Sequence, residues 1–107
     1  MWETRLLRGF LRDLLGLVPT LDLHGRKVPE ALRETEAFLR EAAERGEPRV
    51  RIVYGKGHGS PGGVGVLRRA VPAWIEQHGG DRVERFERQI DASGNDGAMI
   101  VWLRRTR

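Results

Sequence analysis

The sequence predicts an α/β fold for a chain of 107 residues, a length that fits one domain with one modest core. Short apolar segments alternate with stretches whose apolar residues recur at three- and four-residue spacing, which is typical of strands alternating with amphipathic helices. The last segment, "AMIVWL", is apolar at odd and even positions alike, as in a strand buried on both faces. Connections of this length join strands by right-handed crossovers, so we expect parallel pairing within the order α-β-α-β-α-β-β.

The N-terminal segment, residues 1–18, is predicted to be an amphipathic helical arm outside a body formed by residues 19–107. Its apolar residues share one helical face; they are Leu6, Leu7, Phe10, Leu11, Leu14, Leu15 and Val18. Such a stripe either packs on the body, which is its commoner use, or docks a partner protein or a second copy of the chain.

The body begins with a short strand over residues 21–24, because Pro19 and Thr20 break the preceding helix. A helix over residues 28–46 follows, with Pro29 in its first turn and Gly46 at its stop. Its predicted inner face comprises Ala31, Leu32, Thr35, Phe38, Leu39, Ala42 and Ala43.

The second half of the body is predicted to hold three strands and one helix. Residues 49–54, "RVRIVY", form a strand rich in β-branched residues, and residues 66–78 form a helix that Pro72 should kink. Residues 82–90 alternate poorly and should lie at a sheet edge, whereas residues 98–103 should be central. The inner face of the helix is predicted to carry Leu67, Ala70, Val71, Trp74, Ile75 and His78.

Composition excludes several classes of protein. No apolar run approaches the ~20 residues of a membrane span, and the N-terminus lacks the apolar core and cleavage site of a secretory signal. The absence of cysteine excludes disulfides, thiolate nucleophiles and cysteine-ligated zinc. These features fit a cytoplasmic protein. The net charge is +4 and arginine supplies 17 of the 19 basic residues, which favours an anionic partner because guanidinium groups pair with phosphate.

Polar groups gather where the first two strands end. Asp22 and His24 share one face of the first strand, and the second strand runs into a glycine-rich loop, "YGKGHGSPGGVG". Because ligands in open α/β sheets bind outside the carboxyl ends of strands, His24 and this loop should lie at the same edge. Glycines let backbone N–H groups approach an anion, Lys56 adds positive charge, and histidine exchanges protons near neutral pH.

Structural explanations exist for the same residues. An Asp-x-His at a strand end often caps the next turn, and a glycine-rich loop is often only a tight connection. The match to G-x-G-x-x-G through Gly57, Gly59 and Gly62 is weak evidence for a dinucleotide site, since it follows the second strand and contains Pro61. These residues alone indicate a phosphate-binding α/β domain, with a nuclease as one candidate.

Three motifs resemble those of the Smr (small MutS-related) domain family. They are "LDLHG" at residues 21–25, "VYGKGHGSPGGVGVLRRAVPAWI" at 53–75 and "GNDGAMIVWL" at 94–103, in the family's order and spacing. The resemblance covers about residues 20–105 and therefore assigns the body, residues 19–107, to an Smr domain. It implies a two-layer α/β sandwich of βαβαββ type, similar to the C-terminal domain of translation initiation factor three, here with an extra N-terminal helix.

The resemblance also implies an activity. Members of the family are nucleic-acid-binding nucleases that nick DNA or cleave RNA. The family's Asp-x-His pair maps onto Asp22 and His24, and its glycine loop maps onto Gly55, Lys56, Gly57 and Gly59. This sequence departs from the pattern at Tyr54, where many members have histidine or threonine, and in the last motif, where Asn95 replaces one of two paired glycines.

The resulting hypothesis is an endonuclease. Asp22, His24 and His58 are its candidate catalytic residues, and the phosphate would be bound by Gly55, Lys56, Gly57, Gly59, Arg26 and Arg68. RNA supplies a 2′-hydroxyl for cleavage without metal, whereas DNA requires water and favours Mg²⁺ or Mn²⁺ held by Asp22. Two alternatives remain open: a nucleic-acid-binding module without turnover, and a protein-docking domain that acts through the N-terminal helix.

Overall fold

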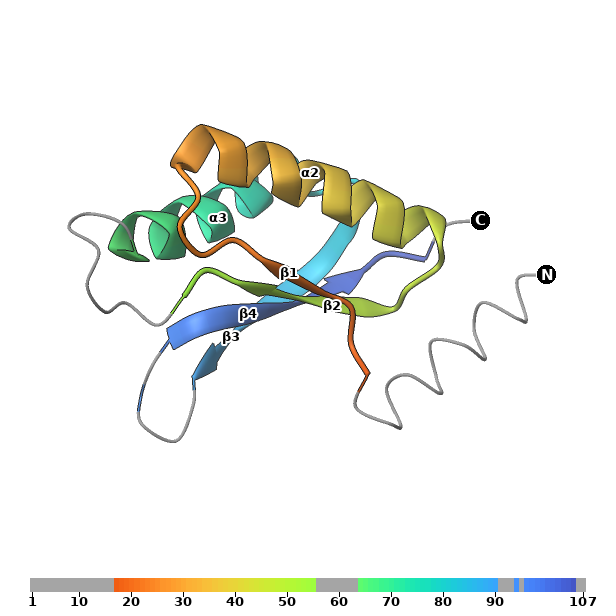
Figure 1. Ribbon diagram of the computed structural model, residues 1–107. Helices are drawn as coiled ribbons and strands as arrows, with labels where there is room; N and C mark the ends of the chain where they lie inside the picture. The colour runs from red at the N-terminus through yellow and green to blue at the C-terminus, as the bar shows by residue number, and fades with distance from the viewer. Residues whose placement is uncertain (1–16, 56–63, 91–93, 95, 106–107) are drawn as a thin grey trace.

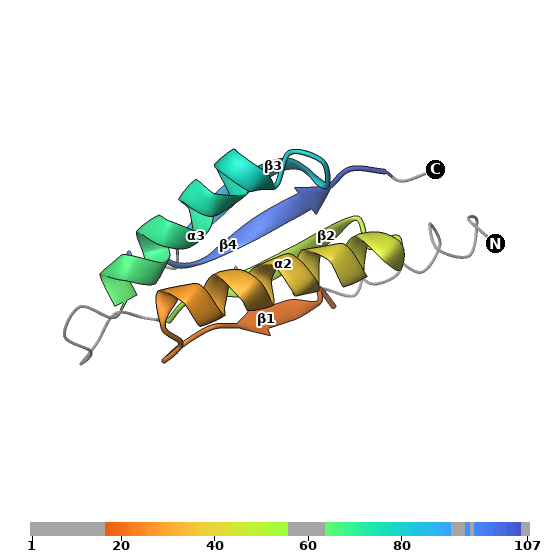
Figure 2. The same cartoon turned by 90° about the horizontal axis from the view of Figure 1, so that it is seen from above.

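The chain folds into a four-stranded sheet with two helices packed on one of its faces (Figure 1). The computed structural model describes residues 17–55, 64–90, 94 and 96–105. The elements are, in order, β1 (Thr20–Asp22), α2 (Val28–Glu44), β2 (Arg49–Val53), α3 (Val64–His78), β3 (Val83–Ile90) and β4 (Asp96–Leu103). Seen from above, the two helices lie side by side over the sheet (Figure 2). The two layers agree with the predicted α/β sandwich, while the predicted arm lies mostly in residues 1–16, outside the described part.

The sheet is mixed, with strand order β1-β2-β4-β3. β1 pairs with β2 in parallel, as the crossover through α2 predicts. β4 is antiparallel to both β2 and β3, so β3 runs parallel to β2 without touching it. The edge position of β3 and the central position of β4 are therefore confirmed. The expected pairing of β2 with β3 across α3 was wrong, because β4 lies between them; strand order depends on long-range pairing.

Helix α2 follows its prediction closely. It begins at Val28 with a proline in the first turn and ends at Glu44, two residues before Gly46 takes a positive φ of 76°. Leu32 and Phe38 pack against the core from its margin. The fully or nearly buried residues of the helix are Ala31, Thr35, Leu39, Ala42 and Ala43.

Helix α3 begins two residues earlier than predicted and differs at one inner position. Leu67, Val71 and Ile75 are buried at a spacing of four residues, Gly79 continues this stripe just past the end of the helix, and Pro72 is buried beside it. His78 falls beside this stripe, so its side chain is exposed and the prediction of an inner His78 was wrong. The imidazole instead lies 5.6 Å from the Trp74 ring, centroid to centroid.

The core lies between the sheet and the helices. Met99, Val101 and Leu103 of β4 face the helices and are buried. The prediction that β4 is buried on both faces was wrong in part, since both helices cover the same side and Trp102 on the other face is only half-buried. The buried core cluster comprises Leu23, Ala31, Leu39, Ala42, Val50, Ile52, Tyr54, Leu67, Val71, Ile75, Val83, Met99, Val101 and Leu103. Within the described ranges, neither helix has the length and apolar character needed to cross a bilayer.

Candidate active site

The three sequence motifs meet at one end of the sheet. The Leu23 amide donates a 2.7 Å hydrogen bond to the Val53 carbonyl, which joins the carboxyl ends of β1 and β2. The amides of Tyr54 and Gly55 donate to the Gly97 carbonyl at 2.9 and 3.3 Å, which adds the beginning of β4. The predicted common edge for His24 and the start of the glycine loop is thus confirmed as far as Gly55.

A tight turn at this edge shapes the first motif. β1 ends at Asp22, and the Arg26 amide donates to the Leu23 carbonyl at 3.0 Å, closing a four-residue turn. Gly25 occupies the third position with a φ of +78°, a conformation that glycine adopts without strain and that a type II turn requires there. Leu23 is completely buried and anchors the turn in the core, while His24 remains on the surface.

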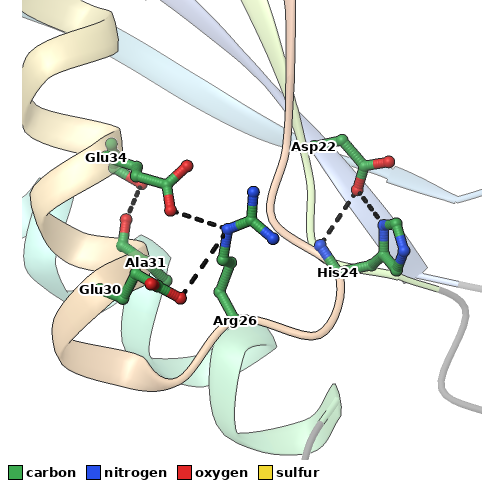
Figure 3. Close-up of polar contacts among 7 residues, drawn as sticks. Asp22, His24, Arg26, Glu30, Ala31 and Glu34 are labelled. Atoms are coloured by element: carbon green, nitrogen blue, oxygen red, sulfur yellow. Dashed lines mark hydrogen bonds and ion pairs between the residues drawn. The ribbon is translucent and has the colours of Figure 1, made fainter.

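The turn brings Asp22 and His24 into direct contact (Figure 3). Oδ1 of Asp22 accepts a 3.0 Å hydrogen bond from the His24 backbone amide and lies 2.9 Å from Nδ1 of the His24 ring. In a regular strand these side chains would stand about two residue rises apart, so it is the end of the strand that permits the contact. With Nδ1 beside the carboxylate, Nε2 is the ring nitrogen left for a ligand.

The electrostatics of the pair favour an ionised aspartate beside an accessible imidazole. The backbone hydrogen bond from His24, reinforced by its ring, lowers the pKa of Asp22 below its ordinary value of 3.8. The two side chains are 75% exposed for His24 and 55% for Asp22, so a large substrate reaches both. A carboxylate that orients an imidazole through Nδ1 holds the tautomer in which Nε2 accepts a proton.

Arg26, a predicted phosphate ligand, is held by helix α2. Its Nε donates to Glu34 Oε2 at 2.8 Å and lies 3.8 Å from Glu30 Oε1 (Figure 3). The hydrogen bond to Glu34 is the main reason that the pKa of Arg26 rises above its ordinary value. Both contacts use Nε, so Arg26 ties the turn to α2, and its role as a phosphate ligand stays a prediction. The sequence analysis missed Glu30 and Glu34, although Glu30 follows Arg26 by four residues and Glu34 follows Glu30 by four.

The remaining predicted ligands are only partly described. Gly55 leaves β2 with a positive φ of 119°. Lys56, Gly57, His58 and Gly59 lie outside the described residues, so their roles stay predictions. Tyr54, where the resemblance leads us to expect histidine or threonine, is 1% exposed and belongs to the core cluster.

Arg68 lies on α3, one turn after the helix begins. It is half-buried, and its Nε is buried without a hydrogen-bond partner among the residues that the structure describes. The role of Arg68 as a phosphate ligand stays a prediction. In the same described part of the chain, no three His, Cys, Asp or Glu side chains gather as a metal site would need.

Comparison with known proteins assigns this arrangement to a family. The model of the Smr domain matches residues 21–104, which contain the whole described sheet except Thr20. The chain belongs to the Smr domain family. The Smr domain of Thermus thermophilus MutS2 superposes with a TM-score of 0.68 at 34% identity, covering 81% of this chain and 99% of that one. The Smr domain of B3BP, solved in solution, gives a TM-score of 0.59 at 26% identity over 97% of this chain and 100% of that one.

Curated relatives are mostly much longer proteins. Endonuclease MutS2 of Symbiobacterium thermophilum is 37% identical over 86 residues, which are 80% of this chain but 10% of the relative. An uncharacterized protein of Treponema pallidum is 38% identical over 99 residues, or 89% of this chain and 46% of the relative. This Smr domain therefore spans about a tenth of the MutS2 relatives that it matches.

Proposed function

We propose that this Smr domain is an endonuclease whose catalytic centre is the Asp22–His24 pair. The observation that carries the proposal is the contact of Asp22 Oδ1 with both the amide and Nδ1 of His24, at an exposed sheet edge. A merely structural cap needs only the amide contact, whereas the ring contact prepares Nε2 for proton transfer. The names of the MutS2 relatives, which are endonucleases, support the same class of activity.

The chemistry follows from which protons the pair can move. With RNA, His24 Nε2 takes the proton of a 2′-hydroxyl, whose oxygen then attacks the neighbouring phosphorus. The new O2′–P bond forms as the P–O5′ bond breaks, and a 2′,3′-cyclic phosphate results. Asp22 stabilises the imidazolium that His24 becomes. Lys56 and the amides of the glycine loop would bind the phosphate, and His58 would protonate the leaving oxygen or stabilise its charge.

DNA lacks the internal nucleophile and would require an activated water. A bound Mg²⁺ or Mn²⁺ would supply that activation, and it prefers several oxygen ligands. Among the described residues, Oδ1 of Asp22 already takes part in two contacts, and the Glu30 and Glu34 carboxylates at the same turn are paired with Arg26. This donor set does not fit a resident divalent ion, which favours RNA as the substrate.

The decisive experiment compares substrates and variants in one cleavage assay. Purified protein is incubated with end-labelled single-stranded RNA, single-stranded DNA and plasmid, each with EDTA, Mg²⁺ or Mn²⁺. A proton-transfer histidine contributes ~10²–10⁴-fold to rate, so His24→Ala and Asp22→Ala should lose cleavage while keeping most affinity. His58→Ala should lose less. His78→Ala is the matched control, because this exposed histidine lies at the end of α3.

Two results would contradict the proposal. His24→Ala cleaving at the wild-type rate, in a preparation free of contaminating nuclease, would remove His24 from the chemistry. Wild type that binds nucleic acid but cleaves none of the three substrates would favour a clamp without turnover. Melting curves of each variant show whether it is still folded, so that a loss of cleavage by a folded variant can be assigned to the missing side chain.

A further inference from the structure

The sheet face opposite the helices carries arginines in a regular array. Pairing partners in a sheet point to the same side, and the buried Val50, Ile52, Met99 and Val101 define the side that faces the helices. The alternate residues therefore form three cross-strand rows on the other side. These rows are Arg49–Trp102–Arg85, then Thr20–Arg51–Ile100–Glu87, then Asp22–Val53–Ala98–Gln89.

The first row holds an aromatic ring between two arginines. Trp102 of β4 is paired with Arg49 on one side and Arg85 on the other. The Arg85 guanidinium lies over the indole, 3.7 Å from the ring centroid, and also pairs with Glu87. Because the Arg85 side chain is still 51% exposed, the outer side of this stack offers a flat cationic surface.

The second row contains a further arginine, Arg51. Arg51 is half-buried, and its Nε is buried without a hydrogen-bond acceptor among the described residues. Beside it, Ile100 is only 9% exposed although no described helix covers this face. Long arginine stems commonly cover apolar surface in this way while their guanidinium groups stay available.

The third row joins this face to the candidate active site. Asp22 begins that row, and β2 ends at Val53, two residues before Gly55 at the start of the glycine loop. Arg49 and Arg51 precede Val53 at two-residue spacing, so β2 presents a line of cations that leads to the loop. The distance along β2 from the first row to the third is about 13 Å, the rise of four strand residues.

We propose that this sheet face binds the single-stranded nucleic acid that flanks the cleaved bond, with phosphates along Arg49 and Arg51 and a base stacked at Arg85–Trp102. The inference rests on the proposed nuclease function and adds where the substrate runs. A single strand is the fitting occupant because its unpaired bases expose faces for stacking, whereas duplex bases already stack on one another. Contacts on this face would add affinity that does not depend on base sequence.

The test measures binding under conditions that prevent cleavage. Fluorescence anisotropy is recorded in EDTA with oligodeoxynucleotides and 2′-O-methyl RNA of about 4 and about 12 nucleotides, the range that single-strand-binding grooves cover. The variant is Arg51→Gln combined with Arg85→Gln. The matched control is Arg33→Gln combined with Arg40→Gln, which removes two exposed charges from α2 on the opposite layer.

We expect the sheet variant to lose affinity for the long probe by about 5- to 150-fold, the equivalent of one lost base stack. Its salt slope should fall by about 0.7 for each lost phosphate contact on a single strand. The short probe occupies only the sheet edge at Asp22 and His24, so the sheet variant should bind it with wild-type affinity. The control variant should retain wild-type affinity for both probes.

Each contrary outcome identifies what fails. If wild type and the sheet variant bind the long probe equally well, the sheet face does not bind the flanking strand, and the nuclease proposal stands. If wild type binds no probe, both proposals fall. If the sheet variant loses affinity but wild type cleaves no RNA, binding by the sheet face is supported and the nuclease activity is not. If the sheet variant changes only the oligomeric state measured by light scattering, the sheet face is a contact between copies of the chain, and the proposed binding of nucleic acid there is overturned.

Discussion

At the scale of single residues, the candidate site depends on how one turn places two side chains. Asp22 and His24 contact each other because β1 stops and the chain reverses within the next four residues. The sequence supplied both chemical groups, but their hydrogen bond exists only because the turn shortens the distance between them. Local backbone geometry is therefore the feature to perturb.

Substituting Gly25 tests that geometry. A Cβ at Gly25 would meet no atom within 4 Å, so the cost of Gly25→Ala comes from its φ of +78° alone. Left-handed backbone costs an ordinary residue roughly 1–2 kcal/mol, and asparagine less than most. We expect Gly25→Ala to lower the free energy of unfolding by about that amount and Gly25→Asn to lower it less, as measured by urea denaturation. Equal losses for the two variants would mean that this φ is not the cause.

The ionisation of Asp22 should appear in the pH dependence of stability. The pKa of Asp22 is lowered in the folded state. Its contribution to the free energy of unfolding is therefore complete above pH 3.8 and is lost as the pH falls through the lower native pKa. We expect wild type to melt above Asp22→Asn at pH 7, and the difference to shrink below pH 4. A difference that grows as the pH falls would show that the native pKa is raised instead. The effect is small because both partners are exposed.

At the scale of elements, the end of α3 offers two adjacent glycines with opposite expectations. A Cβ at Gly79 would lie 2.7 Å from the Ile75 carbonyl oxygen and 3.3 Å from Val83 Cγ2, so Gly79→Ala forces the backbone to move. Overpacking of this kind costs about 1–3 kcal/mol. Gly80 has open space around it and no positive φ, so Gly80→Ala should be neutral or stabilising by up to about 1 kcal/mol.

Thermal and urea denaturation of both variants provide the check. Gly79→Ala should lower stability and Gly80→Ala should not. If both variants unfold like wild type, the close approach of α3 to β3 at Gly79 is not a constraint of the fold.

At the scale of the whole molecule, the excess of arginine should govern binding. Affinity for RNA and DNA should fall steeply between about 50 and 200 mM salt, because bound phosphates release their counterions. Lys56→Ala should weaken both nucleic acids by a similar factor, since a contact to phosphate carries no base information. Filter binding at several salt concentrations measures both effects. Affinity that does not change with salt would favour protein docking.

The sequence by itself determined which segments form the body and which of their faces are buried. Helical spacing identified the core residues of α2, and poor alternation identified β3 as an edge strand. These features depend on local propensity and on the period of apolar residues, both of which are present in the sequence itself. The residue types of the candidate site, Asp22, His24 and the glycine loop, were likewise visible in the sequence.

Only the tertiary structure decided how those parts meet. It inserted β4 between β2 and β3, tied Arg26 to Glu34 and left His78 on the surface. It also aligned Arg49 and Arg51 of β2 with Trp102 of β4 and Arg85 of β3 on one face, although the three strands are far apart in the sequence. Strand order and register depend on long-range pairing, which the alternation of residues within a single strand does not specify.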